Sequence, residues 1–115
     1  MSANPNDITA KYTSLQHELE EHVIARQKLE TQLQENKIVQ DEFETLKEDS
    51  QVYKLTGNVL LPVEQDEAKS NVLKRLEFIN TEIKRCEDNI KSKQTQLEQL
   101  RSEIIKLQAS QSPQA

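Results

Sequence analysis

The run from His17 to His22, with the sequence HELEEH, is the stretch whose residue types come nearest to a catalytic motif. Zinc proteases place two histidines four residues apart on one helical face, with a glutamate between them as general base. Here the histidines are five residues apart, which separates them by about 140° around a helix. We therefore expect a solvated His17 and no metal site. We expect His22 to lie in the seam, the stripe of side chains along which one helix packs against another.

The other residue types that carry chemistry lack the neighbours they need. Cys86 is the only cysteine, which excludes an intramolecular disulfide and a cysteine-based metal cluster, and we expect it to be a small core residue. Gly57 is the only glycine, so the chain has no phosphate-binding loop. No serine or cysteine has a plausible base beside it in a pocket. We expect no catalytic residues, no cofactor and no enzymatic activity.

The composition favours a coiled coil over a globular domain. Of 115 residues, 34% are hydrophobic, 30% are charged and 3% are aromatic. The hydrophobic and aromatic fractions are too low to fill the core of a globular domain. The net charge is −5, with acids and bases interleaved, so nucleic-acid binding is not expected. The sequence has neither an apolar run of about 18 residues nor a signal-peptide core. We expect a soluble, intracellular protein that does not bind membranes.

The second half of the chain predicts a long coiled-coil helix over about residues 66–110, followed by a frayed tail over 111–115. Apolar residues recur at alternating steps of four and three, which is the pattern of a narrow helical seam. Only one member of the series, Lys93, is charged. The seam consists of Val72, Leu76, Ile79, Ile83, Cys86, Ile90, Lys93, Leu97, Leu100, Ile104 and Leu107.

The first half predicts a rougher helix over about residues 5–49. His22 and Arg26 interrupt its apolar seam. Further on, Val39 fits the apolar pattern better than Gln40, which implies that the seam advances by three residues after Asn36 where the regular spacing would be four. The seam runs through Ile8, Tyr12, Leu15, Leu19, His22, Arg26, Leu29, Leu33, Asn36, Val39, Phe43 and Leu46.

The short connector between the helices forces them to pack antiparallel, so that residues whose numbers sum to about 115 face each other. This register places Ile8 near Leu107 and brings His22 and Arg26 close to Lys93. A charged layer of this kind lowers the stability of the seam but fixes its register. It also offers a way for the free ends of the helices to splay.

Residues 51–64 predict a β-hairpin at the bend. Two β-forming runs, Val52–Thr56 and Val59–Val63, flank Gly57 and Asn58, which tolerate the positive φ of a two-residue turn. With this turn Thr56 pairs with Val59. The predicted fold is thus mostly α: a long antiparallel two-helix coiled coil with one hairpin at the bend.

Both faces of the predicted hairpin are mostly apolar. One face carries Tyr53, Leu55, Leu60 and Pro62, and the other carries Val52, Val59, Leu61 and Val63. A lone two-stranded hairpin is marginally stable and leaves two open edges, so we expect an oligomer assembled through hairpins. A structural coiled-coil spacer would explain the helices but not this hairpin. A homo-oligomeric scaffold is a second alternative, which the size of the purified chain would distinguish.

The hairpin and its flanks resemble the β-class subunits of the prefoldin family, which have one hairpin where the α class has two. The resemblance rests on Leu29–Asn36, Val52–Leu61 and Arg75–Arg85, and it extends over nearly the whole chain as a single domain. It implies a heterohexamer of two α-class and four β-class subunits. Their hairpins would join into a double β-barrel from which six coiled coils project.

The resemblance further implies a cytoplasmic, ATP-independent holding chaperone that captures unfolded actin and tubulin and passes them to the cytosolic chaperonin. The expected assembly residues are Val52, Tyr53, Leu55, Gly57, Asn58, Val59, Leu60, Leu61 and Val63. The expected client contacts, at the helix ends farthest from the turn, are Ile8, Tyr12, Leu15, Ile104, Ile105 and Leu107. Ile105 lies beside the seam and is the best single candidate. For the other five, ordinary seam packing is the alternative.

Overall fold

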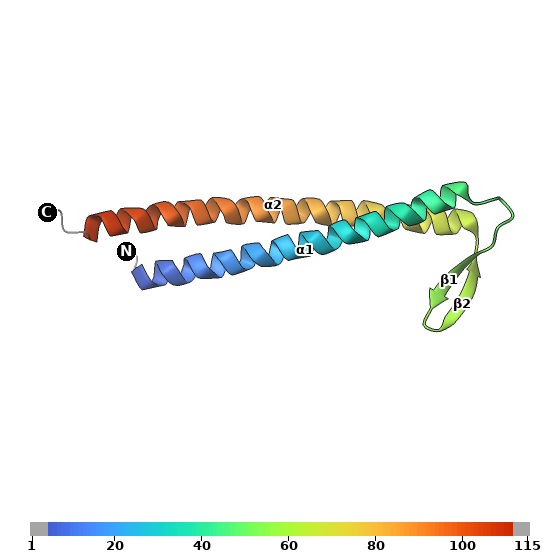
Figure 1. Cartoon of the computed structure of the whole chain (residues 1–115), viewed down its shortest axis with the longest axis horizontal. Helices are drawn as coiled ribbons and strands as arrows, with labels where there is room; N and C mark the ends of the chain where they lie inside the picture. Colours follow the sequence, from blue (N-terminus) through green and yellow to red (C-terminus); the bar gives the residue numbers. More distant parts are fainter. Residues whose placement is uncertain (1–4, 112–115) are drawn as a thin grey trace. The chain divides into compact units, whose positions relative to one another are not determined.

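The structure is a computed structural model that describes residues 5–111 (Figure 1). Helix α1 (Pro5–Thr45) is followed by strands β1 (Val52–Thr56) and β2 (Val59–Val63), and then by helix α2 (Gln65–Gln111). The predicted order of helix, hairpin and helix is confirmed. The tail that the sequence predicts after residue 111 lies outside the described residues.

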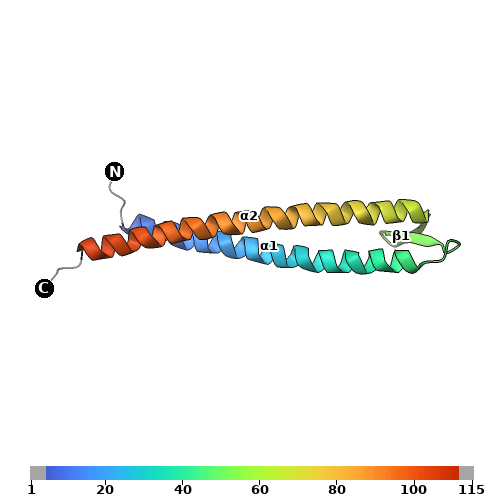
Figure 2. The ribbon, with the colours of Figure 1, turned by 90° about the horizontal axis from the view of Figure 1, so that it is seen from above.

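The contacts of the chain fall into two units. Of the described residues, 5–27 with 84–111 form the first, here called the terminal unit, and residues 28–83 form the second, here called the hairpin unit. Within each unit a part of α1 packs against a part of α2, and the two helices run in opposite chain directions (Figures 1 and 2).

The hairpin unit has its own apolar core. Five side chains, each no more than 7% exposed, form it, and two partly buried side chains pack against them. All of these residues occupy predicted seam positions, because steps of three and four keep side chains on one face of a helix. The buried five are Leu33, Val72, Leu76, Ile79 and Ile83, and the other two are Leu29 and Phe43.

The terminal unit has a second, separate core. Its buried members are Ile8, Leu15, Leu97 and Leu100, with Tyr12, Leu19, Ile104 and Leu107 packed against them. Ile8 and Leu107 therefore belong to one cluster, as the antiparallel register requires. Along the whole of α2, every residue of the predicted seam is buried or half-buried, which confirms that series.

The C-terminal part of α1 differs from the sequence prediction in two ways. Gln40 is half-buried while Val39 is 37% exposed, so the seam keeps its regular spacing through Gln40 and the predicted three-residue step is wrong. The helix also ends at Thr45, and not near residue 49. The reason is a change in hydrogen bonding: the Leu46 N–H donates to the Phe43 carbonyl at 3.3 Å, three residues back, so the chain tightens and leaves the helix.

The hairpin has the predicted register, with Thr56 opposite Val59 and Leu55 opposite Leu60. Gly57 has a φ of +63°, and no other residue from 5 to 111 has a positive φ. Positive φ at the first central position alone is the pattern of a type II′ turn, which twists in the same sense as the strands it joins. Glycine is thus needed at residue 57, whereas Asn58 is in an ordinary backbone conformation.

Replacing Gly57 with alanine is expected to weaken assembly through backbone strain alone, because an added Cβ meets no atom within 4 Å. A left-handed conformation costs an alanine about 1–2 kcal/mol, which corresponds to a roughly 5–30-fold weaker association. The affinity of the variant for the partner subunits that the resemblance implies measures this effect. The control is Asn58→Ala, which should associate normally. Equal affinities of the two variants would contradict the turn assignment.

Candidate assembly and client-binding surfaces

The hairpin presents a continuous apolar surface to solvent. Tyr53, Leu55, Val59, Leu60 and Leu61 are between 47% and 68% exposed, and they lie on both faces of the two strands. Large exposed patches of this kind mark interaction sites, because water cannot favourably cover them. Val52 and Val63, opposite each other at the base, are half-buried. Together with Gly57 and Asn58 these residues make up the predicted assembly set, here called the hairpin surface.

The edges of the hairpin are also available. Within the described residues β1 and β2 form a two-stranded sheet and pair only with each other. The outer edge of each strand therefore has backbone N–H and C=O groups without a ladder partner, and such edges pair readily with further strands. Pro62, opposite Tyr53, has no N–H to donate and restricts pairing at its position.

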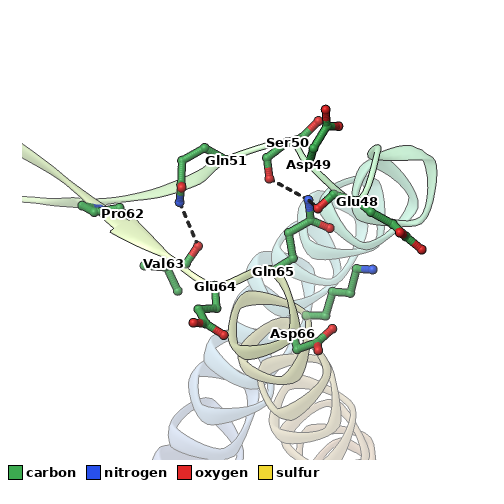
Figure 3. Close-up of a pocket in the computed structure, with 10 residues that line it drawn as sticks. Glu48, Asp49, Ser50, Gln51, Pro62, Val63, Glu64, Gln65 and Asp66 are labelled. Atoms are coloured by element: carbon green, nitrogen blue, oxygen red, sulfur yellow. Dashed lines mark hydrogen bonds between the residues drawn. The ribbon is translucent and has the colours of Figure 1, made fainter.

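Two glutamine side chains hold the base of the hairpin (Figure 3). Gln65 Nε2, at the start of α2, donates to the carbonyl oxygens of Ser50 at 2.6 Å and Lys47 at 2.7 Å. Gln51 Nε2 donates to the Val63 carbonyl at 3.2 Å, across the strand pair. The Gln65 contacts fix the segment between α1 and β1 to the start of α2, and the Gln51 contact ties the base of β1 to β2. The sequence analysis missed both residues, since a glutamine beside a strand has no distinctive pattern.

The hollow beside these glutamines is polar and mostly acidic. It is lined on one side by Glu48 and Asp49 and on the other by Glu64 and Asp66 (Figure 3). Among the described residues no group of three or more histidine, cysteine, aspartate or glutamate side chains is arranged to hold a metal ion. None of the described helices is long and apolar enough to cross a membrane.

The six predicted client contacts all lie in the terminal unit but differ in exposure. Ile8 and Leu15 are buried, and Tyr12, Ile104 and Leu107 are half-buried, so these five pack in the seam. Ile105 is 58% exposed and stands outside this cluster. Tyr12 also accepts a hydrogen bond at 3.0 Å from Arg101 Nη2 on the opposite helix, which joins α1 and α2 on one flank of the seam.

A charged layer interrupts the seam of the terminal unit. Lys93 Nζ lies 2.8 Å from Glu18 Oε2, and Arg26 lies 4.0 Å from Glu87. His22 is half-buried in the same region. The sequence analysis identified the cations of this layer but missed both carboxylates, because Glu18 and Glu87 flank the seam and do not belong to the heptad series. The predicted solvated state of His17 is confirmed by its side-chain exposure of 73%.

The ion pair of Glu18 and Lys93 predicts a pH dependence. The hydrogen bond and positive charge of Lys93 hold the pKa of Glu18 below its usual range. A carboxylate with a lowered pKa contributes stability above its unfolded pKa, and that contribution is lost as the pH falls through the lowered value. Glu18→Gln should therefore destabilise the chain at neutral pH, and the difference from the wild type should vanish in acid.

Thermal unfolding followed by circular dichroism, in steps from neutral to about pH 3, tests this prediction. The control is Glu20→Gln, which changes an exposed glutamate of the same helix. A difference between Glu18→Gln and wild type that persists unchanged in acid would show that the pair contributes no pH-dependent stability.

Comparison with known proteins gives one consistent family. A family model described as prefoldin subunit matches residues 6–111. Prefoldin subunit 6 of Saccharomyces cerevisiae is 70% identical over 102 residues, which cover 89% of this chain and 90% of that protein. Human prefoldin subunit 6 is 44% identical over 98 residues, covering 85% of this chain and 76% of the human protein.

A solved structure gives the same result for the fold. The crystal structure of the prefoldin beta subunit from Thermococcus strain KS-1 aligns with a TM-score of 0.82 and 25% identity, covering 96% of this chain and 94% of that one. The expected similarity to β-class subunits is confirmed by the archaeal structure, and both eukaryotic relatives are prefoldin subunit 6.

Proposed function

This chain belongs to the prefoldin family of chaperone subunits, and we propose that it joins the prefoldin hexamer through its hairpin surface and holds unfolded proteins at its terminal unit. It assembles with five other prefoldin subunits, two of the α class and three of the β class. Their hairpins complete an inter-subunit β-barrel. The complex acts in the cytoplasm without ATP, holds unfolded actin and tubulin, and passes them to the cytosolic chaperonin.

The observation that carries this proposal is the exposure of the hairpin on both faces and at both edges. Leu55 and Leu60 are 68% and 60% exposed, and burying a leucine fully is worth about 1.5–3 kcal/mol. A subunit that buried this surface against further strands would gain that energy and satisfy the edge hydrogen bonds as well. A spacer that only linked two other proteins would have no use for such a surface.

Client holding is supported by the arrangement of the terminal unit. Its apolar cluster is separate from that of the hairpin unit, so the helix ends can open without disturbing the residues near the hairpin. Weak contacts of this kind hold a client when several subunits engage it at once, because linked sites raise the effective concentration. No step in this scheme requires a catalytic residue, and we expect no enzymatic activity.

The direct test mixes this chain with the other subunits of its hexamer and measures the light scattering of unfolded actin without ATP. We expect the complex to suppress aggregation and the chain alone to be much less effective. An intact hexamer that leaves actin aggregation unchanged would overturn the holding function. Size measurement of the chain alone distinguishes the scaffold alternative, which requires a stable homo-oligomer.

A further inference from the structure

The two flanks of the seam in the terminal unit are different. On one flank lie two adjacent surface hollows, which share Glu103. The first hollow reaches the seam residues Leu15 and Leu100, and the second reaches Ile8 and Leu107. Gln96, Glu103 and Ser110 of α2 line these hollows and recur every seven residues, so both hollows open on the same side of the helix.

The opposite flank carries a side-chain bridge between the two helices. There the hydrogen bond of 3.0 Å between Arg101 and Tyr12 bridges the two helices over the seam. Ile105 comes four residues after Arg101 and therefore lies on this bridged side. A bound segment on this side would meet Ile105 and the Tyr12–Arg101 bridge, whereas a segment on the hollowed side would reach several seam residues.

The charged lining of the hollowed flank is mainly basic, although the whole chain has a net charge of −5. Lys11 lines the first hollow and Lys106 the second, and Glu103 is the one acidic residue in either lining. In the part of the chain that the structure describes, neither lysine has an ion-pair partner within 4.0 Å. Both are available to a carboxylate of a bound molecule.

We propose that an apolar segment of an unfolded protein docks along the hollowed flank of the terminal unit, over Leu15, Leu100 and Leu107, with an acidic residue of that segment beside Lys11 or Lys106. This inference rests on the holding function proposed above and specifies where and in what orientation it acts. The seam residues are mostly buried, so one segment gains little apolar contact, and the lysines add selectivity for segments with acidic neighbours.

Site-specific photo-crosslinking in the assembled complex tests the choice of flank. In a Cys86→Ala background, a photoreactive probe is attached at Gln96→Cys on the hollowed flank or at Gln94→Cys two residues earlier. Both are exposed glutamines of α2, but Gln94 lies seven residues before Arg101 and so on the bridged flank. We expect crosslinking of unfolded actin from residue 96 to exceed that from residue 94 at least about threefold. Equal yields, or a higher yield from residue 94, would overturn the proposal.

Charge reversal tests the acidic preference. Lys11→Glu with Lys106→Glu should weaken capture of an apolar peptide with acidic flanks about threefold or more, and should not weaken capture of the same peptide with lysine flanks. The control is Lys84→Glu with Lys91→Glu, which changes two exposed lysines of the same unit that line neither hollow. Equal effects of the two double variants would overturn the acidic preference.

The aggregation assay separates failure of this inference from failure of the proposed function. A complex that fails to suppress actin aggregation refutes the holding function itself. Normal suppression with equal crosslinking from residues 94 and 96 refutes only the proposed choice of flank.

Discussion

A chain carrying Leu55→Asp and Leu60→Asp is expected to lose assembly with the other prefoldin subunits while its helices stay folded. The two leucines face each other across the strands and are 68% and 60% exposed, so the free chain tolerates the change. Burying both on assembly is worth about 3–6 kcal/mol, at 1.5–3 kcal/mol for each leucine. Loss of that burial alone weakens association roughly 10²–10⁴-fold, and the buried carboxylates add a desolvation cost.

Size-exclusion chromatography of the mixed subunits measures this loss, and circular dichroism of the chain alone measures its helix content. The matched control is Ile24→Asp with Ile38→Asp, which places the same charge at exposed isoleucines of α1, 44% and 58% accessible. The control should enter the complex normally. Assembly of the hairpin variant at wild-type levels would mean that subunits meet elsewhere.

Removal of residues 1–12 and 104–115 is expected to have the opposite effect: assembly is kept and client holding is weakened. The deletion removes Ile8, Tyr12, Ile104 and Leu107 from the apolar cluster of the terminal unit. It leaves the cluster of the hairpin unit and the hairpin surface complete. Because a client held at several subunits loses one linked contact, the concentration of complex that gives half-maximal suppression of actin aggregation should rise roughly tenfold.

The control for this deletion removes only residues 1–4 and 112–115, none of which is a predicted client contact. It should assemble and hold actin like the full chain. If the longer deletion also holds actin normally, client contact does not involve the helix ends, and the assignment of Ile8, Tyr12, Leu15, Ile104, Ile105 and Leu107 is wrong.

The seam of α2 and the register of the hairpin are the parts of the fold that sequence patterns predict best. Steps of three and four place Val72, Leu76 and Ile79 on one helical face whatever lies opposite, and all three are buried. The hairpin register follows from the position of the turn, and Thr56 does pair with Val59. Both are local properties, in which residues a few positions apart determine the outcome.

The end of α1 shows where local patterns fail. Val39 is the more hydrophobic residue, yet Gln40 is the one that faces the seam, because helix geometry continues the spacing from the preceding turns. The residues after Thr45 leave the helix where the side-chain N–H of Gln65, 15 residues after Ser50 in the chain, donates to the carbonyl oxygens of Lys47 and Ser50. Such a contact depends on a distant segment and has no trace in the sequence around it.

The sequence by itself determined the heptad seam of α2, the single turn at Gly57 and the doubly apolar hairpin, since each depends on the periodicity or backbone freedom of neighbouring residues. Only the tertiary structure decided that Glu18 and Glu87 balance the cations of the seam, that Arg101 and Tyr12 bridge one flank, and that two hollows lie on the other. These features arise between two helices, where the reach and direction of individual side chains select the partner. Periodicity specifies which residues share a face but not which side chains meet across it.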